Sequence, residues 1–328
     1  MDSLIFALNA VLPIVLIVAI GYLLKRINFF GEGFPKTLNK LVFRVLLPSM
    51  LFLNVYKIDS IASLEWGYMI YGGAAVLAIV LLSIPVVIIV TQRGERRGAL
   101  LQACVRSNYA LIGIPLAQSL FGEAGMAIAT LLSLVSIPVL NILGVISLSV
   151  FREDGGKPNV GKILLDIVKN PLIQSIALGL AVLGIRALFV NCSIDFRLSD
   201  VAVVYKVLGY LSNLATPLAL LMLGVQFEFS AVGELKKEIC LGVIMRAIVV
   251  PVLGLGTAYL FFRDSFGGAH FAAFVALFAT PVSVSSVPMA QEMGGDHVLA
   301  GQLVVWTTLF AALSVFVASF ILKAAGIF

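Results

Sequence analysis

The sequence predicts an all-α membrane protein whose ten transmembrane helices form two inverted repeats of five. Its 328 residues are 61% hydrophobic and only 12% charged, with a mean hydropathy of +1.09, far more apolar than a soluble domain. Turn-forming and charged residues divide the chain into ten apolar stretches, each long enough to cross a bilayer. In addition, one interrupted apolar stretch in the first half has a second copy in the second half.

The ten expected helices follow one another with short connections. A spanning helix needs about 20 mainly apolar residues. The stretches that meet this length are 4–24, 35–56, 66–91, 99–121, 125–150, 162–188, 202–226, 238–262, 269–293 and 298–323. The longest polar connections, about 151–161 and 186–200, leave no room for a soluble domain. Asp2 precedes the first apolar run and no basic residue does, which favours a retained first helix over a cleaved signal peptide.

Lysines and arginines indicate the orientation of these helices, because short cytoplasmic connections carry more of them. One set of connections holds Lys25, Arg26, Lys36, Arg93, Arg96, Arg97, Arg152, Lys157, Lys162, Lys236 and Lys237. The opposite set, with the tail, holds only Lys57, Arg186, Arg197, Arg263 and Lys323. We therefore expect a multi-pass protein of the inner (plasma) membrane with both termini outside the cytoplasm and the connection around Asp154 inside.

The internal repeat sets the predicted topology. Without a gap, Pro115-Leu-Ala-Gln118 aligns with Pro288-Met-Ala-Gln291, and other Pro and Gly pairs match in the same order in both halves. Five helices is an odd number, so the second copy must enter the membrane from the opposite side. The predicted repeats are residues 1–152 and 153–328, within a single integrated membrane domain.

Two stretches are expected to be broken in the middle of the membrane. Asn108, Gly113 and Pro115 interrupt 99–121, and Pro281 and Pro288 interrupt 269–293. Proline removes a helical hydrogen bond, and non-helical backbone at membrane depth persists only inside protein or beside a water-filled cavity. We predict that the two breaks cross, with half-helix amino ends facing a central site that suits a carboxylate. The alternative is a pair of kinked packing helices.

The predicted substrate site combines neutral polar groups with one arginine. Its candidate residues are Arg106, Ser107, Asn108, Gly113, Pro115, Gln118, Pro281, Ser283, Ser285, Ser286, Pro288 and Gln291. Arg106 is preferred to Arg44 and Arg246 as the cation on the substrate side, although each arginine has the alternative of snorkelling to the headgroups. No acidic residue lies at the centre of an expected helix, which favours carriage of an anion over exchange of cations.

Several other functions lack a sequence signal. Neither the three cysteines nor His270 and His297 show metal-ligand spacing, and no catalytic or nucleotide-binding motif occurs, so we expect neither an enzyme nor a cofactor. The formal charge of +5 reflects cytoplasmic helix ends and indicates no nucleic-acid partner. Coupling to sodium or protons stays open, and a membrane receptor that does not transport is the alternative from another class.

The whole chain resembles the auxin efflux carrier family, in its bacterial branch without a long central loop. The matching pieces are LNKLVFRVLLPSMLF, SNYALIGIPLAQSLFG, KNPLIQSIALGL, ATPLALLMLGVQF and SVPMAQEMGGD. The resemblance implies inverted repeats with crossed broken helices, as in the bile acid sodium symporters. It also implies a homodimer formed by one bundle, elevator-like movement of the other, and a small organic anion as substrate.

The resemblance also assigns roles to single residues. Asn108 matches the asparagine that contacts substrate carboxylate, and Pro115 and Pro288 match the crossover prolines. The plant motif has a proline between two asparagines, where this chain has Ser107-Asn108-Tyr109. Because of this departure, the match does not support auxin as the substrate. A sodium- or proton-coupled symporter of the bile acid type is the alternative mechanism.

Overall fold

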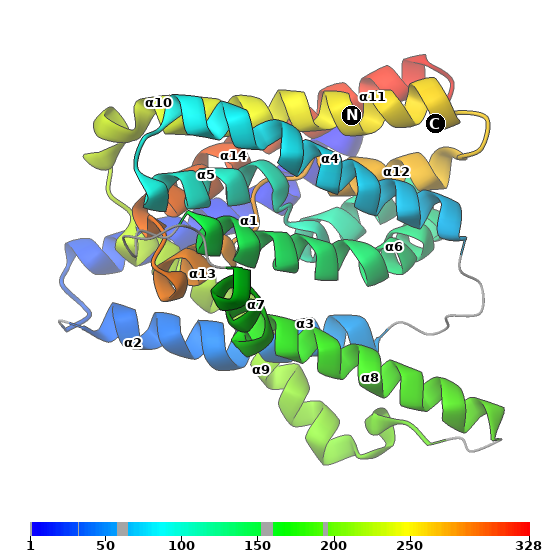
Figure 1. Cartoon of the computed structure of the whole chain (residues 1–328), viewed down its shortest axis with the longest axis horizontal. Coiled ribbons are helices and arrows are strands. Elements are labelled where there is room, and N and C mark those ends of the chain that lie inside the picture. The colour runs from blue at the N-terminus through cyan, green and yellow to red at the C-terminus, as the bar shows by residue number, and fades with distance from the viewer. Residues whose placement is uncertain (1, 32, 58–64, 152–159, 193–195) are drawn as a thin grey trace.

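Apart from one isolated bridge, every regular element in the described residues is a helix (Figure 1). The structure is a computed structural model that describes residues 2–31, 33–57, 65–151, 160–192 and 196–328. Its α-helices are α1 (Asp2–Arg26), α2 (Phe34–Leu41), α3 (Leu47–Tyr56), α4 (Trp66–Val90), α5 (Gly94–Val105), α6 (Ile114–Val150), α7 (Val160–Lys169), α8 (Pro171–Asn191), α9 (Ala202–Gln226), α10 (Ala231–Ile244), α11 (Val250–Phe262), α12 (Gly268–Phe278), α13 (Ser286–Met293) and α14 (His297–Ala324). Three π-helices, η1 (Val42–Leu46), η2 (Tyr109–Gly113) and η4 (Met245–Val249), and the 3-10 turn η3 (Leu198–Asp200) complete the list.

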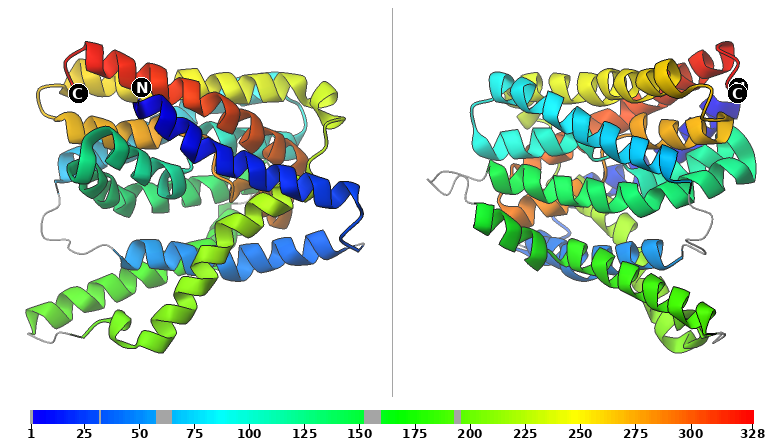
Figure 2. Two further views of the ribbon diagram at one scale, coloured as in Figure 1. Left: turned by 180° about the vertical axis from the view of Figure 1, so that it is seen from behind. Right: turned by 45° about the vertical axis from the view of Figure 1, so that its right-hand side comes forward.

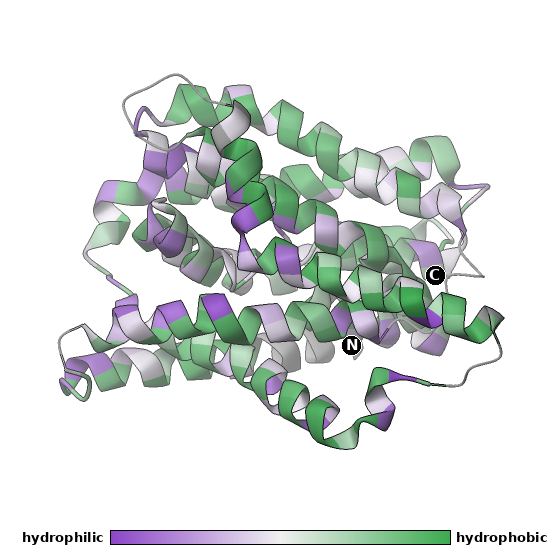
Figure 3. Cartoon of the chain, turned by 60° about the horizontal axis from the view of Figure 1, so that its bottom comes forward, coloured by the Kyte–Doolittle hydropathy of each residue, from purple (hydrophilic) through white to green (hydrophobic). Residues whose placement is uncertain are grey.

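Seven helices in the described chain are long and apolar enough to cross a membrane. They are Phe34–Tyr56, Trp66–Val90, Tyr109–Val150, Pro171–Val190, Ala202–Gln226, Ala231–Phe262 and His297–Ala324. By contrast, α5 has 12 residues, α12 has 11 and α13 has 8, so at about 1.5 Å per residue each is shorter than the ~30 Å hydrocarbon layer. Figure 3 shows mostly hydrophobic helices, with hydrophilic residues concentrated at helix ends and connections.

Apart from α7, which contacts both α6 and α8, the helices of the described chain divide into two packed groups. We call α1, α2, η1, α3, α8 and α9 the outer group, because α3 packs on α8 and α9, and α9 packs along α1 (Figures 1 and 2). We call α4, α5, η2, α6, α10, η4, α11, α12, α13 and α14 the crossover group, in which α6 packs on α4, α5 and α12. Gly21 and Gly224 allow close contact of α1 with α9, since a side chain at either would collide with the backbone of the other helix.

Each π-helix directly precedes a helix with proline in its first turn. The prolines are Pro48 in α3, Pro115 in α6 and Pro251 in α11. A proline has no N–H and clashes with the carbonyl four residues earlier, and a π turn relieves both problems by shifting the hydrogen-bond register. The chain therefore passes these prolines without a sharp kink.

A bend in α6 occurs where two separate helices were expected. Phe121 and Gly122 have non-helical backbone angles inside α6, and Gly122 has φ 62° and ψ −153°, a conformation open mainly to glycine. The expected stretches 99–121 and 125–150 meet at this bend. Similarly, the expected stretch 162–188 divides at Asn170, whose side chain caps the start of α8.

The prediction of an all-helical membrane protein is confirmed at this level. The count of ten spanning helices and the inverted repeat stay predictions, as do the sides of the termini and the homodimer. The predicted repeat boundary at 152/153 and the connection around Asp154 lie outside the described residues.

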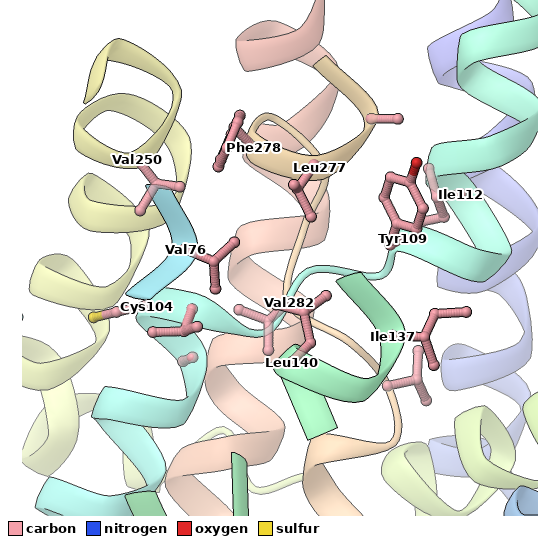
Figure 4. Packing of buried hydrophobic residues seen from close by; sticks show 14 of the residues in the cluster. Val76, Cys104, Tyr109, Ile112, Ile137, Leu140, Val250, Leu277, Phe278 and Val282 are labelled. Atoms are coloured by element: carbon pink, nitrogen blue, oxygen red, sulfur yellow. The ribbon is translucent and has the colours of Figure 1, made fainter. Parts of the chain in front are cut away.

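The two interrupted stretches meet at their breaks. The first unwound segment, residues 106–108, joins α5 to η2, and the second, residues 279–285, joins α12 to α13. Ser107 and Val282 form an antiparallel bridge: Asn108 N donates to Pro281 O at 2.8 Å and Ser283 N donates to Arg106 O at 3.0 Å. Figure 4 shows the two segments passing each other at Val282, surrounded by buried apolar side chains. We call this pairing the crossing.

The crossing yields a test of stability. Val282 N donates to Thr307 Oγ1 of α14 at 3.1 Å, so Thr307→Val leaves a buried N–H without its acceptor. We expect a loss of about 1–3 kcal/mol in the free energy of unfolding, measured by denaturation in detergent. Thr308→Val is the matched control, because Thr308 is equally buried and donates only to Val304 O of its own helix. Equal losses in the two variants would contradict a supporting role for Thr307.

Candidate functional site

A cavity of about 660 Å³ lies between the outer group and the crossover group. The outer group contributes residues of α1, α3 and α9, among them Pro13, Asn54 and Thr216. The crossover group contributes both unwound segments, the start of η2 and α6, and Asn141 from the second half of α6. The crossing therefore forms one wall of this cavity.

Six of the predicted substrate-binding residues line this cavity. They are Arg106, Ser107, Asn108, Pro115, Ser283 and Ser285. The crossing thus brings together residues that lie more than 170 positions apart in the sequence.

The other six predicted residues support the region without lining the cavity. Pro281 accepts the hydrogen bond from Asn108 N, and Pro288 and Ser286 are buried in the first turn of α13. Gly113 packs against Ala276 of α12, and a Cβ there would lie 3.0 Å from the Ala276 carbonyl oxygen. The two glutamines lie further away, where Gln118 donates to Glu123 at 2.7 Å and Gln291 accepts from Gln226 at 3.1 Å.

Two buried polar groups at the crossing have no protein partner. Asn108 Nδ2 and Ser107 Oγ are both enclosed and make no hydrogen bond, although buried polar groups are nearly always paired. Ser283 and Ser285 are paired only with each other, through hydroxyls 2.8 Å apart. These groups can donate hydrogen bonds to a polar molecule in the cavity.

The amino end of η2 faces the same cavity. The first hydrogen bonds of η2 run from Ile112 N and Gly113 N to Asn108 O, at 3.0 and 3.2 Å. The N–H groups of the preceding residues have no acceptor within the helix, and Tyr109, Ala110 and Leu111 line the cavity. Such a helix start carries partial positive charge and favours an anion.

Arg106 places a full positive charge beside these groups. Its side chain is only 2% exposed and lines the cavity. Nη2 donates to Asn141 Oδ1 at 2.7 Å, while Nη1 lies 2.8 Å from the thioether sulfur of Met289, a weak acceptor. None of the described carboxylates forms an ion pair with Arg106. A buried guanidinium of this kind is costly unless an anion neutralises it.

Arg246 is equally buried but has a different role. Its guanidinium donates to three backbone carbonyls, those of Thr280 at 2.7 Å, Leu277 at 2.9 Å and Val105 at 3.4 Å. Val105 and Leu277 belong to the ends of α5 and α12, where helices leave their last acceptors unpaired, and Thr280 follows in the second unwound segment. Arg246 therefore joins the two broken helices immediately before they cross.

Some cavity residues carried no clear signal in the sequence. Asn141, Ser212, Asn213, Asn54 and Lys57 line the cavity but were not predicted as site residues. Asn141 is the most informative, because a lone amide in the middle of the apolar stretch 125–150 is unusual and could have been noticed. Asn213 lies one turn before Thr216-Pro217 in α9.

Side chains that do not line the cavity connect α13 to the outer group. Arg44 Nε of η1 lies 3.5 Å from Glu292 Oε2, and Gln226 of α9 donates to Gln291. The Arg44 side chain is 60% exposed, so this ion pair is a weak contact.

No described group of three or more His, Cys, Asp or Glu side chains could hold a metal ion. Titratable residues instead form a polar cluster at the start of α5. Arg96 pairs there with Glu234, with Asp296 at 3.3 Å and with Glu238 at 3.7 Å. This cluster joins α5, α10 and the start of α14 within the crossover group.

Comparison with known proteins agrees with a membrane carrier. Residues 6–319 match the model of a family described as membrane transport protein. An uncharacterized transporter of Methanothermobacter thermautotrophicus is 23% identical over 324 residues, covering 93% of this chain and 95% of its own. An uncharacterized transporter of Methanocaldococcus jannaschii is 27% identical over 265 residues, covering 74% and 76%. These relatives are transporters rather than enzymes, and the chain belongs to this membrane transport protein family, that of the auxin efflux carriers.

Proposed function

We propose that the protein is a secondary transporter for a small organic anion, which binds at the crossing. The observation that carries this proposal is the buried guanidinium of Arg106, which lines the cavity without a carboxylate partner among the described residues. An anion there gains a charge-assisted interaction and removes the cost of the isolated charge.

The neighbouring groups favour a carboxylate within that class. Asn108 Nδ2 and Ser107 Oγ need hydrogen-bond acceptors, and the start of η2 adds N–H groups on the same side. A carboxylate offers two acceptor oxygens with a full negative charge, so it satisfies several of these donors at once. A cavity of about 660 Å³ accommodates a small organic molecule with some water.

The arrangement of the groups favours alternating access by an elevator movement. The cavity lies at the boundary between the groups and extends to Asn54 and Lys57, at the end of α3. In the proposed cycle, Arg44 and Glu292 mark the closed end, since Arg44 lies ten residues before Asn54, about 15 Å along a helix at 1.5 Å per residue. Sliding of the crossover group along the outer group breaks the contacts at α13 and opens that end. By the distribution of lysine and arginine, the closed end is cytoplasmic, so this conformation faces outward.

Reconstitution in liposomes tests the proposed function. Purified protein is supplied with labelled monocarboxylates, dicarboxylates and indole acetate under a membrane potential, a sodium gradient or a proton gradient. We expect saturable uptake of at least one carboxylate. Saturable binding without uptake would instead indicate a receptor, and the lack of both for every anion would overturn the proposal.

Asn108→Ala tests the position of the site. We expect the affinity for the transported carboxylate to fall by about tenfold, because one hydrogen bond to a charged group is lost. The melting temperature in detergent should change little, since Asn108 Nδ2 bonds to no protein group. Gln118→Ala is the control, as this amide lies outside the cavity on α6. Unchanged affinity in Asn108→Ala would refute the assignment.

Arg106→Gln tests the source of anion selectivity. Loss of the positive charge should weaken binding of the carboxylate by about tenfold or more and affect its neutral amide analogue much less. Isothermal titration with both ligands measures the difference. Arg263→Gln serves as control, because this exposed arginine pairs with Asp264 outside the cavity. Equal losses for the acid and the amide would mean that Arg106 acts only in packing.

A further inference from the structure

Arg246 occupies an unusual position, at the meeting point of two helix ends. It lies on η4, is 2% exposed, and directs its guanidinium to carbonyls of Val105, Leu277 and Thr280. Gly254 brings the helix of Arg246 against α12, because any side chain there would collide with Phe278 at the end of α12. The guanidinium is therefore held firmly at the ends of both α5 and α12.

The carbonyl oxygens that bind Arg246 are of the kind that would coordinate a mobile cation. The last carbonyls of a helix are unpaired and carry partial negative charge. In transporters with discontinuous helices, such carboxyl ends and unwound carbonyls coordinate the coupling sodium ion, while the amino ends face an anionic substrate. In this chain the amino end at Asn108 faces the cavity, whereas the carboxyl ends are bound by Arg246.

We propose that Arg246 is a tethered cation that takes the place of a coupling sodium ion at the crossing, so that transport needs no sodium. This proposal rests on the proposed function and specifies its energy source. The second buried arginine supports it: Arg106 belongs to the first unwound segment, and its carbonyl bonds to Ser283 N of the second. Two fixed positive charges at one crossing disfavour a further cation there, because like charges repel strongly in a medium of low dielectric constant.

A sodium ion and an arginine differ in one functional respect. A mobile ion can bind and leave, and its gradient then drives the substrate, whereas a tethered charge stabilises the crossing in every state of the cycle. With Arg246 in place, an anionic substrate moves according to its own gradient and the membrane potential. Arg246 thus stabilises the crossing as a sodium ion would, but it cannot couple transport to a sodium gradient.

Thermal melting in detergent tests the tethered cation without any substrate. The wild-type protein, Arg246→Ala and Arg246→Lys are melted in choline chloride, in sodium chloride and in choline chloride with millimolar ethylguanidinium. Arg263→Ala is the control, since this arginine is exposed at the end of α11. We expect the wild-type protein and the control to melt at the same temperature in all three salts.

The variants should become sensitive to cations. Arg246→Ala should melt at least about 5 °C lower in choline and regain about half of this loss with ethylguanidinium or sodium, because a bound cation again satisfies the carbonyls. Arg246→Lys should keep most of the wild-type stability. Stabilisation of the wild-type protein by sodium relative to choline would overturn the proposal, as would a loss in Arg246→Ala that no cation restores.

Uptake by the wild-type protein is a second measurement. It needs no variant, so it tests the proposal even if Arg246→Ala fails to fold. Initial rates for the transported carboxylate in sodium and in choline should agree, whereas an increase of about fivefold or more in sodium would overturn the tethered cation. If no carboxylate is taken up at all, the proposed function fails, and the melting of the wild-type protein in sodium and choline still decides whether a sodium ion binds.

Discussion

The structure depends on the backbone pairing between two helices that are interrupted inside an apolar protein. Unwinding a helix there exposes N–H and carbonyl groups that water cannot reach, and each unpaired group costs free energy. The chain satisfies them by three means: the bridge at Ser107 and Val282, the hydroxyl of Thr307, and the guanidinium of Arg246. Two side-chain groups of the first unwound segment, Asn108 Nδ2 and Ser107 Oγ, have no protein partner, and both residues line the cavity. The constraint that makes the break costly thereby also marks the site.

The prolines show how much of this arrangement the sequence could predict. Pro115 and Pro288 correctly indicated two interrupted stretches, but each lies within the second half-helix rather than in the break, Pro288 in the first turn of α13 and Pro115 just after the π-helix η2. Proline is compatible with the first turn of a helix, because the N–H that it lacks would be unpaired there in any case, and the π turn accommodates Pro115. It therefore places the break on its amino-terminal side, at 106–108 and 279–285, and only Pro281 belongs to an unwound segment.

The roles of the two buried arginines could not be predicted from local pattern. Arg246 bonds to carbonyls 31, 34 and 141 residues away, and the partner of Arg106 lies 35 residues away in another helix. Sequence spacing within a helix gives no information on such contacts, whereas hydrophobicity correctly predicted an all-helical membrane protein. Asn141 illustrates the intermediate case, since a lone amide in an apolar stretch signals an internal partner but does not identify it.

The relative strength of the contacts indicates which parts of the molecule move. Within the crossover group, the crossing consists of buried backbone hydrogen bonds and three bonds to one guanidinium, and Arg96 joins α5 to α10 and α14. Between α13 and the outer group, the polar contacts among the described residues are the partly exposed pair of Arg44 with Glu292, one bond between glutamines, and a 3.5 Å contact of Asn170 Nδ2, at the start of α8, with the weakly accepting sulfur of Met293. Surface ion pairs contribute about 0–1 kcal/mol, so thermal motion readily breaks them. These contacts support the proposed movement of the whole crossover group, in which the crossing and the proposed anion site stay intact.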